Sequence, residues 1–327
     1  MSVLDAPHFH DEAAAYAYVE ARVWPNGRTC PHCGAVDESG KALQGKRDRI
    51  GLYKCYACRK PFTVKIGTIF EASHIPLHVW LQAMFLMASS KKGISSHQLH
   101  RTLGITLKSA WFLSHRIREA MAIGYVRPDG QMGGPGKVVE ADETVIGPNP
   151  TKDSRVRRKY PGKHSRAHLV PIYSLVERGG EVRSFHVRDV STATLTGIMQ
   201  DQVNEKTYIM TDEATAYRPV KRMFLAHSSV NHSRGEYVRE AVHTNTVENF
   251  FSIFKRGLFG TYQHMSQKHL ARYLAEFDFR YNNRKGLGIE DVERADNIVK
   301  AAPGKRLTYR IPRKRNGKAV VVPPPAL

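Results

Sequence analysis

The sequence predicts an α/β fold in the second half of the chain, preceded by a small cysteine-rich module and a helical region. Three observations predict it. All four cysteines lie between residues 30 and 58, apolar residues recur at helical spacing between residues 76 and 123, and short apolar runs alternate with amphipathic segments from residue 137 onward. With 327 residues, the chain is long enough for two or three domains, each with a buried core.

The composition indicates a polyanionic partner. The formal net charge is +20 and the isoelectric point is about 9.9, an excess typical of nucleic-acid-binding proteins. Lys152–Arg166 holds seven Lys or Arg against one Asp, and the tail after Pro303 holds seven with no acid, although solvated basic segments would also explain such runs. Because no apolar stretch of 18 residues and no signal pattern occurs, we expect a cytoplasmic, bacterial, nucleoid-associated protein with no membrane contact and with reduced cysteines.

The cysteines predict a zinc ribbon within residues 1–75, which also hold an N-terminal helix. They form two CxxC pairs with 21 residues between them, and the four expected ligands of one structural Zn²⁺ ion are Cys30, Cys33, Cys55 and Cys58. Gly34 permits the tight turn after the first pair, whereas His32 is expected at the surface. A redox pair or a disulfide framework would not suit a cytosolic chain with two matched knuckles.

Residues 76–127 predict a helix-turn-helix DNA-binding region. The expected elements are a helix over Pro76–Ser90, helices over Ser95–Thr102 and Thr106–Ile123, and the turn Leu103-Gly104-Ile105. The last helix could enter a major groove, with Thr106, Lys108 and Ser109 at its leading end. A plain helical bundle is the alternative, and the neighbouring ribbon and basic charge favour DNA binding.

The α/β domain is expected over residues 137–302, between the Gly- and Pro-rich segment Pro128–Gly136 and a basic, disordered tail over residues 303–327. The predicted order is three strands, a helix, a strand, a helix, a strand and a helix. The strands are expected at Lys137–Gly147, His168–Val176, Glu181–Val187, Thr207–Thr211 and Met223–Val230, with a helix capped by Ser191 or Thr192 and a last helix from about Thr246 to Leu258. This order matches a ribonuclease H-like core, in which the first and fourth strands lie side by side.

Three acids in this domain predict a divalent metal site. Asp142 lies near the end of the first strand, Asp212 ends the fourth strand, and Glu248 lies in the last helix after an interval of 35 residues. If the first and fourth strands are neighbours, the two aspartates meet at one edge of the sheet. Carboxylates so arranged can hold a pair of metal ions against a phosphodiester.

Each acid also has a structural explanation. Glu140 and Glu143 flank Asp142, and strand alternation puts Glu140 on the same face as Asp142, so the choice among them stays open. The acid at the end of the fourth strand could begin a turn. Glu248 lies three residues after Asn245, which is the spacing of a helix capping pair.

The last helix carries a cation near its acid. Glu248, Ser252 and Lys255 share one face at steps of four and seven residues, so Lys255 could hold a DNA phosphate beside the metals. A solvated lysine on an exposed face is the alternative. The opposite, apolar face consists of Val247, Phe250, Phe251, Phe254 and Leu258.

The chain resembles the zinc-ribbon-containing insertion-sequence transposases of the ISXO-like group along nearly its whole length. The matching stretches are Trp24-Pro25 before CPHCG, YKCYACRKPFTVKIGTIFEASHIPLHVW, VVEADETVIG, YIMTDEATAY, HTNTVENFFSIFKRGLFGTY and KHLARYLAEFDFRYNNR. The resemblance implies that Asp142, Asp212 and Glu248 are the metal-binding triad of a DDE enzyme and that Lys255 is the basic residue following it. Some members carry Asn or His at the third position, so a Glu there favours the standard triad. The four cysteines are implied to be the zinc ligands.

The implied activity is DNA transposition with two Mg²⁺ or Mn²⁺ ions. Such ions clamp the attacking and leaving oxygens of an in-line displacement. A water would cut the element end, and the freed 3′-hydroxyl would attack target DNA without ATP, in agreement with the missing GxxxxGK[ST] motif. The expected partners are the terminal inverted repeats, target DNA and further copies of the chain in a homodimer or larger complex. Candidate phosphate contacts are Arg157, Arg158 and Lys159 of the basic loop, and candidate neighbours of the site or the DNA are His243, Asn282 and Arg284.

Two other functions fit parts of the pattern. A DNA-binding regulator could combine the ribbon and the helix-turn-helix with an inert core, but the intact acidic triad argues against it. A metal-dependent nuclease or junction resolvase would share the fold and the metals and would cut without joining. An assay that distinguishes cleavage from strand transfer separates it from a transposase.

Overall fold

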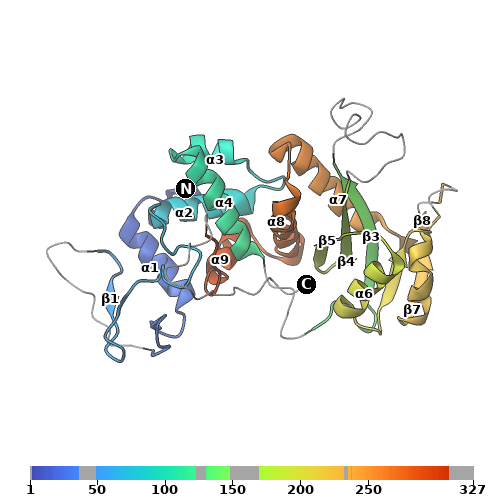
Figure 1. Ribbon diagram of the computed structural model, residues 1–327, viewed down its shortest axis with the longest axis horizontal. Helices are drawn as coiled ribbons and strands as arrows, with labels where there is room; N and C mark the ends of the chain where they lie inside the picture. Colours follow the sequence, from blue (N-terminus) through green and yellow to red (C-terminus); the bar gives the residue numbers. More distant parts are fainter. Residues whose placement is uncertain are drawn as a thin grey trace, which may run out of the picture.

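The computed structural model describes residues 2–36, 49–122, 130–147, 169–231, 235–236 and 238–308. These residues form an elongated molecule with a helical half and a half built around a sheet (Figure 1). The cysteine module lies at one end, the five-stranded sheet lies toward the other, and helix α8 lies between the two halves. None of the described helices is long and apolar enough to cross a membrane.

The helical half is built from both ends of the chain. Its helices are α1 (Glu12–Val23), α2 (Leu77–Ser89), α3 (Ser96–Leu103), α4 (Leu107–Met121) and α9 (Asp291–Lys300), with short 3₁₀ turns η1 (Val3–Asp5) and η2 (Pro7–Phe9) before them. Trp80 of α2, Ile117 of α4 and Ile298 of α9 belong to one buried apolar cluster. Helix α9 is therefore a core helix of this half.

The predicted helix–turn–helix segment contains both expected helices, but the second one is mostly buried. Gly104 ends α3 in a left-handed conformation with φ of 65°, and the Thr106 side chain accepts a hydrogen bond from the Ser109 backbone N–H at the start of α4. From Leu113 to Arg118 every residue of α4 is buried, because this helix packs against α2, α3, α8 and α9. The fully exposed residues of α4, Leu107 and Lys108, lie in its first turn, so its leading end is the part of this helix most open to a partner.

The five-stranded sheet has the order β5-β4-β3-β6-β7. Its strands are β3 (Val138–Ile146), β4 (Val170–Glu177), β5 (Val182–His186), β6 (Tyr208–Thr211) and β7 (Ala226–Ser229). The hairpin strands β3, β4 and β5 run antiparallel, whereas β3, β6 and β7 pair in parallel. The predicted contact between the first and fourth strands is confirmed, because β3 pairs directly with β6.

Helices cover both faces of this sheet. On one face, α6 (Thr192–Gln202) and the 3₁₀ helix η3 (Thr215–Arg222) contribute Leu195 and Tyr217 to a buried cluster. On the other, α7 (Asn245–Gly257) and α8 (Leu270–Asn282) contribute Phe254 and Phe277 to a second cluster. Because successive side chains of a strand alternate between faces, the even-numbered positions of β3 point toward α7.

Two elements differ from the sequence prediction. The helix predicted between the fourth and fifth strands is the 3₁₀ helix η3, which contains Pro219, a residue that cannot donate a helical hydrogen bond. The following strand begins at Ala226 rather than Met223, because the backbone N–H groups of Met223 and Phe224 donate to the Val220 carbonyl instead of to a neighbouring strand.

The remaining described elements are short. They are β1 (Tyr53–Lys54), β2 (Pro61–Phe62), β8 (Val238–Arg239), β9 (Val242–His243), the π-helical turn η5 (Leu258–Tyr262) that continues α7, and the 3₁₀ turns η6 (Gln267–His269) and η7 (Lys285–Leu287). The first two strands belong to the cysteine module.

Candidate functional site

The four cysteines form one compact cluster. All four Sγ atoms lie within 4.8 Å of one another. The Sγ atoms of Cys30 and Cys58 are 3.7 Å apart, as are those of Cys33 and Cys55. Four thiolates arranged tetrahedrally at about 2.3 Å from a zinc ion are separated by about 3.8 Å. The cluster therefore has the dimensions of a structural zinc site.

The two knuckles of this cluster repeat one backbone design. The Cys30 N–H donates to the Ala35 carbonyl at 2.9 Å, and the Cys55 N–H donates to the Lys60 carbonyl at 3.0 Å. Gly34 occupies the left-handed position of the first turn with φ of 73°, as its place after the CxxC pair predicted. Arg59 occupies the same position of the second turn with φ of 62°, a conformation that costs free energy for a residue with a side chain.

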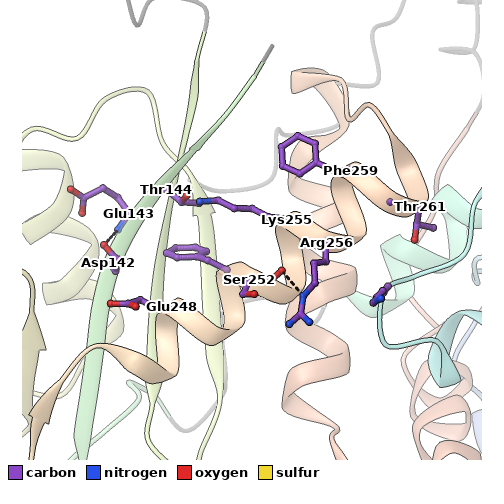
Figure 2. Close-up of a pocket in the computed structure, with 12 residues that line it drawn as sticks. Asp142, Glu143, Thr144, Glu248, Ser252, Lys255, Arg256, Phe259 and Thr261 are labelled. Carbon is purple, nitrogen blue, oxygen red and sulfur yellow. Dashed lines mark hydrogen bonds between the residues drawn. The ribbon is translucent and has the colours of Figure 1, made fainter. Parts of the chain in front are cut away.

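The acidic triad is assembled by the register of the sheet and by α7. Glu140 pairs with Met210 across β3 and β6, so that two residues further along Asp142 and Asp212 reach the same level. Figure 2 shows Asp142 on β3 and Glu248 on α7 lying close together. Both line a cleft of about 920 Å³, and Glu143 lines it as well.

Burial and the neighbouring carboxylates raise the pKa values of two acids in the cleft. The pKa of Asp142 is raised from 3.8 to about 8, first by burial and then by the negative charges of Glu143, Asp212 and Glu248. Burial also raises the pKa of Glu143, although a hydrogen bond of 2.5 Å from the Tyr217 hydroxyl opposes this shift. A divalent cation among these oxygens would relieve the repulsion, and carboxylates are the ligands that Mg²⁺ and Mn²⁺ accept. The donor set thus fits the predicted metals.

Every member of the triad also makes a local structural bond. The Glu143 N–H donates to Asp142, the Ala214 N–H donates to Asp212 at 2.9 Å, and the Thr244 hydroxyl donates to Glu248 at 2.8 Å. The turn at Asp212 is therefore present, whereas the capping pair of Asn245 and Glu248 is not, because the N-cap residue of α7 is Thr244 and its side chain makes no capping hydrogen bond. The partner of Glu248 is Thr244 rather than Asn245, because the helix begins one residue earlier than a cap at Asn245 requires.

Glu140, which the sequence could not separate from Asp142, has a different task. It is fully buried and accepts hydrogen bonds from the Thr246 N–H at 2.8 Å and the Val247 N–H at 3.1 Å. These are backbone groups at the start of α7, where a helix has no internal acceptors and favours a negative charge. Arg178 pairs with Glu140 at 2.6 Å. Glu140 therefore anchors the helix that carries Glu248.

Arg178 was not predicted from the sequence. Its guanidinium also donates to the carbonyls of Ala241 and His243, so it ties the β4–β5 turn to the segment before α7. His243 lies in this network, with Nδ1 3.2 Å from the Glu140 carboxylate. The run Arg178-Gly179-Gly180 is typical of a hairpin turn, but it contains no signal for this long-range contact.

Three cations line the same cleft as the acids. Lys255, predicted from its helical spacing, lies on α7 and extends toward Thr144 of β3 in Figure 2. Arg256 follows it, and Lys92 enters from the connection between α2 and α3. The sequence analysis did not single out the last two. The Lys-Lys-Gly run at residues 91–93 is the one local signal that Lys92 offered.

The other candidate residues lie elsewhere. Asn282 pairs with the backbone of Val182, and Arg284 donates to the Gly180 carbonyl, so both hold the β4–β5 hairpin on α8 rather than lining the cleft. Thr106 and Lys108 are exposed and Ser109 is partly exposed at the start of α4. Arg157, Arg158 and Lys159 fall outside the described residues.

A four-thiolate module joined to an α/β sheet with an acidic, cation-lined cleft defines a class of protein in which a zinc-ribbon-type domain accompanies an α/β domain. Two parts of the chain match known domain families. Residues 10–61 match the transposase zinc-ribbon domain, and residues 132–282 match the ISXO2-like transposase domain. Both matches are to domains of such transposases, so the predicted resemblance is confirmed.

A relative occurs in a mobile element. The chain is 26% identical over 267 residues to a protein in the transposable element ISH50 of Halobacterium salinarum. The aligned region covers 79% of this chain and 86% of the relative. The alignment is therefore far longer than the ribbon alone.

Proposed function

We propose that the chain is a DDE transposase that cleaves DNA at the ends of an insertion sequence and transfers the 3′-hydroxyl ends into target DNA. The observation that carries the proposal is the cleft itself, in which Asp142 and Glu248 face each other beside Lys92, Lys255 and Arg256. Acids alone would repel a DNA strand. Cations along the same walls attract its phosphates and hold one of them against the acids.

The metal ligands in this proposal are Asp142, Asp212 and Glu248. Two Mg²⁺ or Mn²⁺ ions held there would activate the attacking oxygen and stabilise the leaving one. Glu140 and Arg178 keep α7, and with it Glu248, in place on the sheet. The cysteine cluster would hold one Zn²⁺ that stabilises the ribbon, and the ribbon and the exposed first turn of α4 would contact DNA.

The reaction needs no energy cofactor. In the first step a water oxygen bonds to phosphorus and the bond from phosphorus to the 3′ oxygen breaks, which leaves a free 3′-hydroxyl. In the second step that hydroxyl attacks a phosphodiester of the target, so one phosphodiester replaces another. Because two element ends must be joined to one target, we expect at least a homodimer in the active complex.

The test combines purified protein, Mg²⁺, a labelled duplex with the terminal inverted repeats of the encoding element, and a supercoiled target plasmid. Joined products that disappear in Asp142→Ala, Asp212→Ala and Glu248→Ala support the proposal. Cleaved but unjoined DNA favours a nuclease, and binding without either reaction favours a regulator. Zinc content measured by elemental analysis should be one ion per chain and should fall in Cys55→Ser.

A further inference from the structure

Phe259 is an exposed aromatic side chain at the edge of the cleft. With 64% of its surface accessible, it is the most exposed large apolar side chain in the described part of the chain. Single exposed apolar residues are common on protein surfaces and mean little alone. Phe259, however, lines the same cleft as Asp142 and Glu248, and Lys255 lies between them and Phe259 in Figure 2.

The turn that presents Phe259 is fixed from inside the protein. Phe259 is the second residue of the π-helical turn η5, and the first, Leu258, is buried. At the end of the turn, the Tyr262 hydroxyl donates to Glu276 at 2.6 Å, and the buried Glu276 pairs with Arg118 of α4 at 2.6 Å. Anchors on both sides hold the Phe259 ring outward without the loop freedom that would let it fold into the core.

The same turn fixes Lys92. A side chain at Gly257 would collide with Phe277 and with the Lys92 carbonyl, and a side chain at Gly93 would collide with the Tyr262 hydroxyl. The connection between α2 and α3 thus packs directly on the π-helical turn. This close approach brings Lys92 to the wall of the cleft.

An exposed ring in a cleft that cations also line has the chemistry of a site for single-stranded nucleic acid. Such sites combine aromatic rings, on which bases stack, with basic side chains that follow the backbone. Inside a duplex the base faces are covered by neighbouring base pairs, so a protein ring reaches a base face most readily where a base is unpaired. Arg256 lines the same cleft as Phe259, and its Nε donates to the Ser252 carbonyl at 3.2 Å.

We propose that Phe259 stacks on an unpaired nucleobase of a DNA strand bound in the cleft, while Lys92 and Arg256 hold the adjacent phosphates. The proposal rests on the proposed function in that the strand is the one presented to the acids. It adds that the cleft accepts DNA with locally separated strands.

The test measures binding in the presence of EDTA, so that no cleavage occurs. The probes are a mixed-sequence duplex with a short single-stranded thymidine tail, the same duplex with an abasic tail, and the blunt duplex. We expect Phe259→Ala to weaken binding of the thymidine-tailed probe by about 5- to 150-fold, the range of one stacked base. Phe259→Trp should retain the affinity, whereas Phe259→Leu, apolar but unable to stack, should behave like the alanine variant.

Two comparisons make the result specific to stacking. Removing the bases from the tail should weaken the unaltered protein as much as Phe259→Ala does, and should not weaken that variant further. Lys92→Ala should reduce the affinity for thymidine and abasic tails by the same factor. Tyr208→Ala, which removes a ring that is 43% exposed on β6 and does not line the cleft, is the matched control and should bind like the unaltered protein.

The inference is overturned if Phe259→Ala binds the thymidine tail normally, or loses equal affinity for all three probes. Cleavage assays in Mg²⁺ keep this outcome separate from the proposed function. Cleavage without a base-dependent effect of Phe259→Ala leaves the proposed function and removes the inference. Base-dependent binding without cleavage or joining by the unaltered protein does the reverse.

Discussion

The cysteine cluster and the acidic cleft are built in opposite ways. The cluster takes all its ligands from two similar turns, and these turns bring the four sulfurs within 4.8 Å of one another. The predicted triad takes its acids from β3, the end of β6 and α7, of which Asp142 and Glu248 line the cleft and Asp212 does not, and no group of three acids in the described parts of the chain converges as closely. Local turns suffice for the first site, whereas the second depends on sheet register and on the anchoring of one helix.

The difference has an energetic side. Burial first, and then the negative charges of neighbouring acids, raise the pKa of Asp142 and disfavour its charged form, so the protein must hold these acids in place through other contacts. Glu140 supplies these contacts from the same strand, two residues away. A site that is closed and a site that is kept open for substrate should therefore respond differently to metal removal, mutation and pH.

The largest expected effect comes from a chelator that distinguishes the two sites. Dialysis against EDTA at neutral pH should lower strand cleavage on the order of a thousandfold, because hard ions in an open cleft exchange readily. Added Mg²⁺ should restore the activity. Zinc content, measured by elemental analysis, should stay at one ion per chain. Loss of zinc together with activity would show that the cluster is not the closed site that its geometry indicates.

The next effect concerns the anchor of α7. Glu140→Ala leaves Arg178 and the first N–H groups of α7 without their buried partner, which should lower the unfolding free energy by about 3 to 5 kcal/mol. Glu140→Gln keeps the shape and should fold better, but should require more Mg²⁺ for half-maximal cleavage. Glu177→Gln on β4 is the matched control, and its Mg²⁺ requirement should match that of the unaltered protein.

A smaller effect is expected from pH. The pKa of Asp142 is about 8 in the folded protein against 3.8 ordinarily, so without metal the native state binds more protons than the unfolded chain between these values. The unfolding free energy contributed by this group should therefore fall as the pH rises from 4 to 8, by about 1 to 3 kcal/mol after allowing for solvent in the cleft. Denaturant titrations at several pH values measure it. Asp142→Asn, or saturating Mg²⁺, should flatten the curve.

The smallest effect tests the repeated knuckles. Arg59 adopts the left-handed conformation that Gly34 adopts in the first knuckle. Arg59→Gly should stabilise the cluster by up to about 1 kcal/mol, and Gly34→Ala should destabilise it by a similar amount. Competition with a zinc-binding dye reports both changes. The two substitutions should change the zinc affinity in opposite directions. A change in the same direction would mean that the two turns are not equivalent.

The comparison also explains what could be predicted from the sequence. The cysteine cluster follows from two CxxC pairs, because its geometry is set within each turn. The adjacency of β3 and β6, and with it the meeting of Asp142 and Asp212, follows from the order of the elements. The choice between Asp142 and Glu140 did not follow. Strand alternation puts both on one face, and only the contact with Arg178 and α7, formed by folding, separates them.

Other features were missed for related reasons. Lys92 reaches the cleft only because Gly93 and Gly257 permit close packing between two halves of the molecule. Phe259 lies just beyond the predicted end of the last helix, where a π-helical turn replaces the regular spacing on which the prediction relied. The burial of α4 likewise depends on α8 and α9, which lie far away in the sequence.

The position of α9 affects when the protein can fold during its synthesis. Ala295, Ile298 and Val299 of this helix complete the apolar cluster that also contains Trp80 of α2. Helices α1, α3 and α4, which pack on α2, are synthesised before the sheet domain, whereas α9 is synthesised after it. The helical half therefore cannot close until α9 has emerged, so a nascent chain stopped before residue 290 should leave α2 open to protease. Newly made protein would thus gain a stable helical half only after the sheet domain has been made.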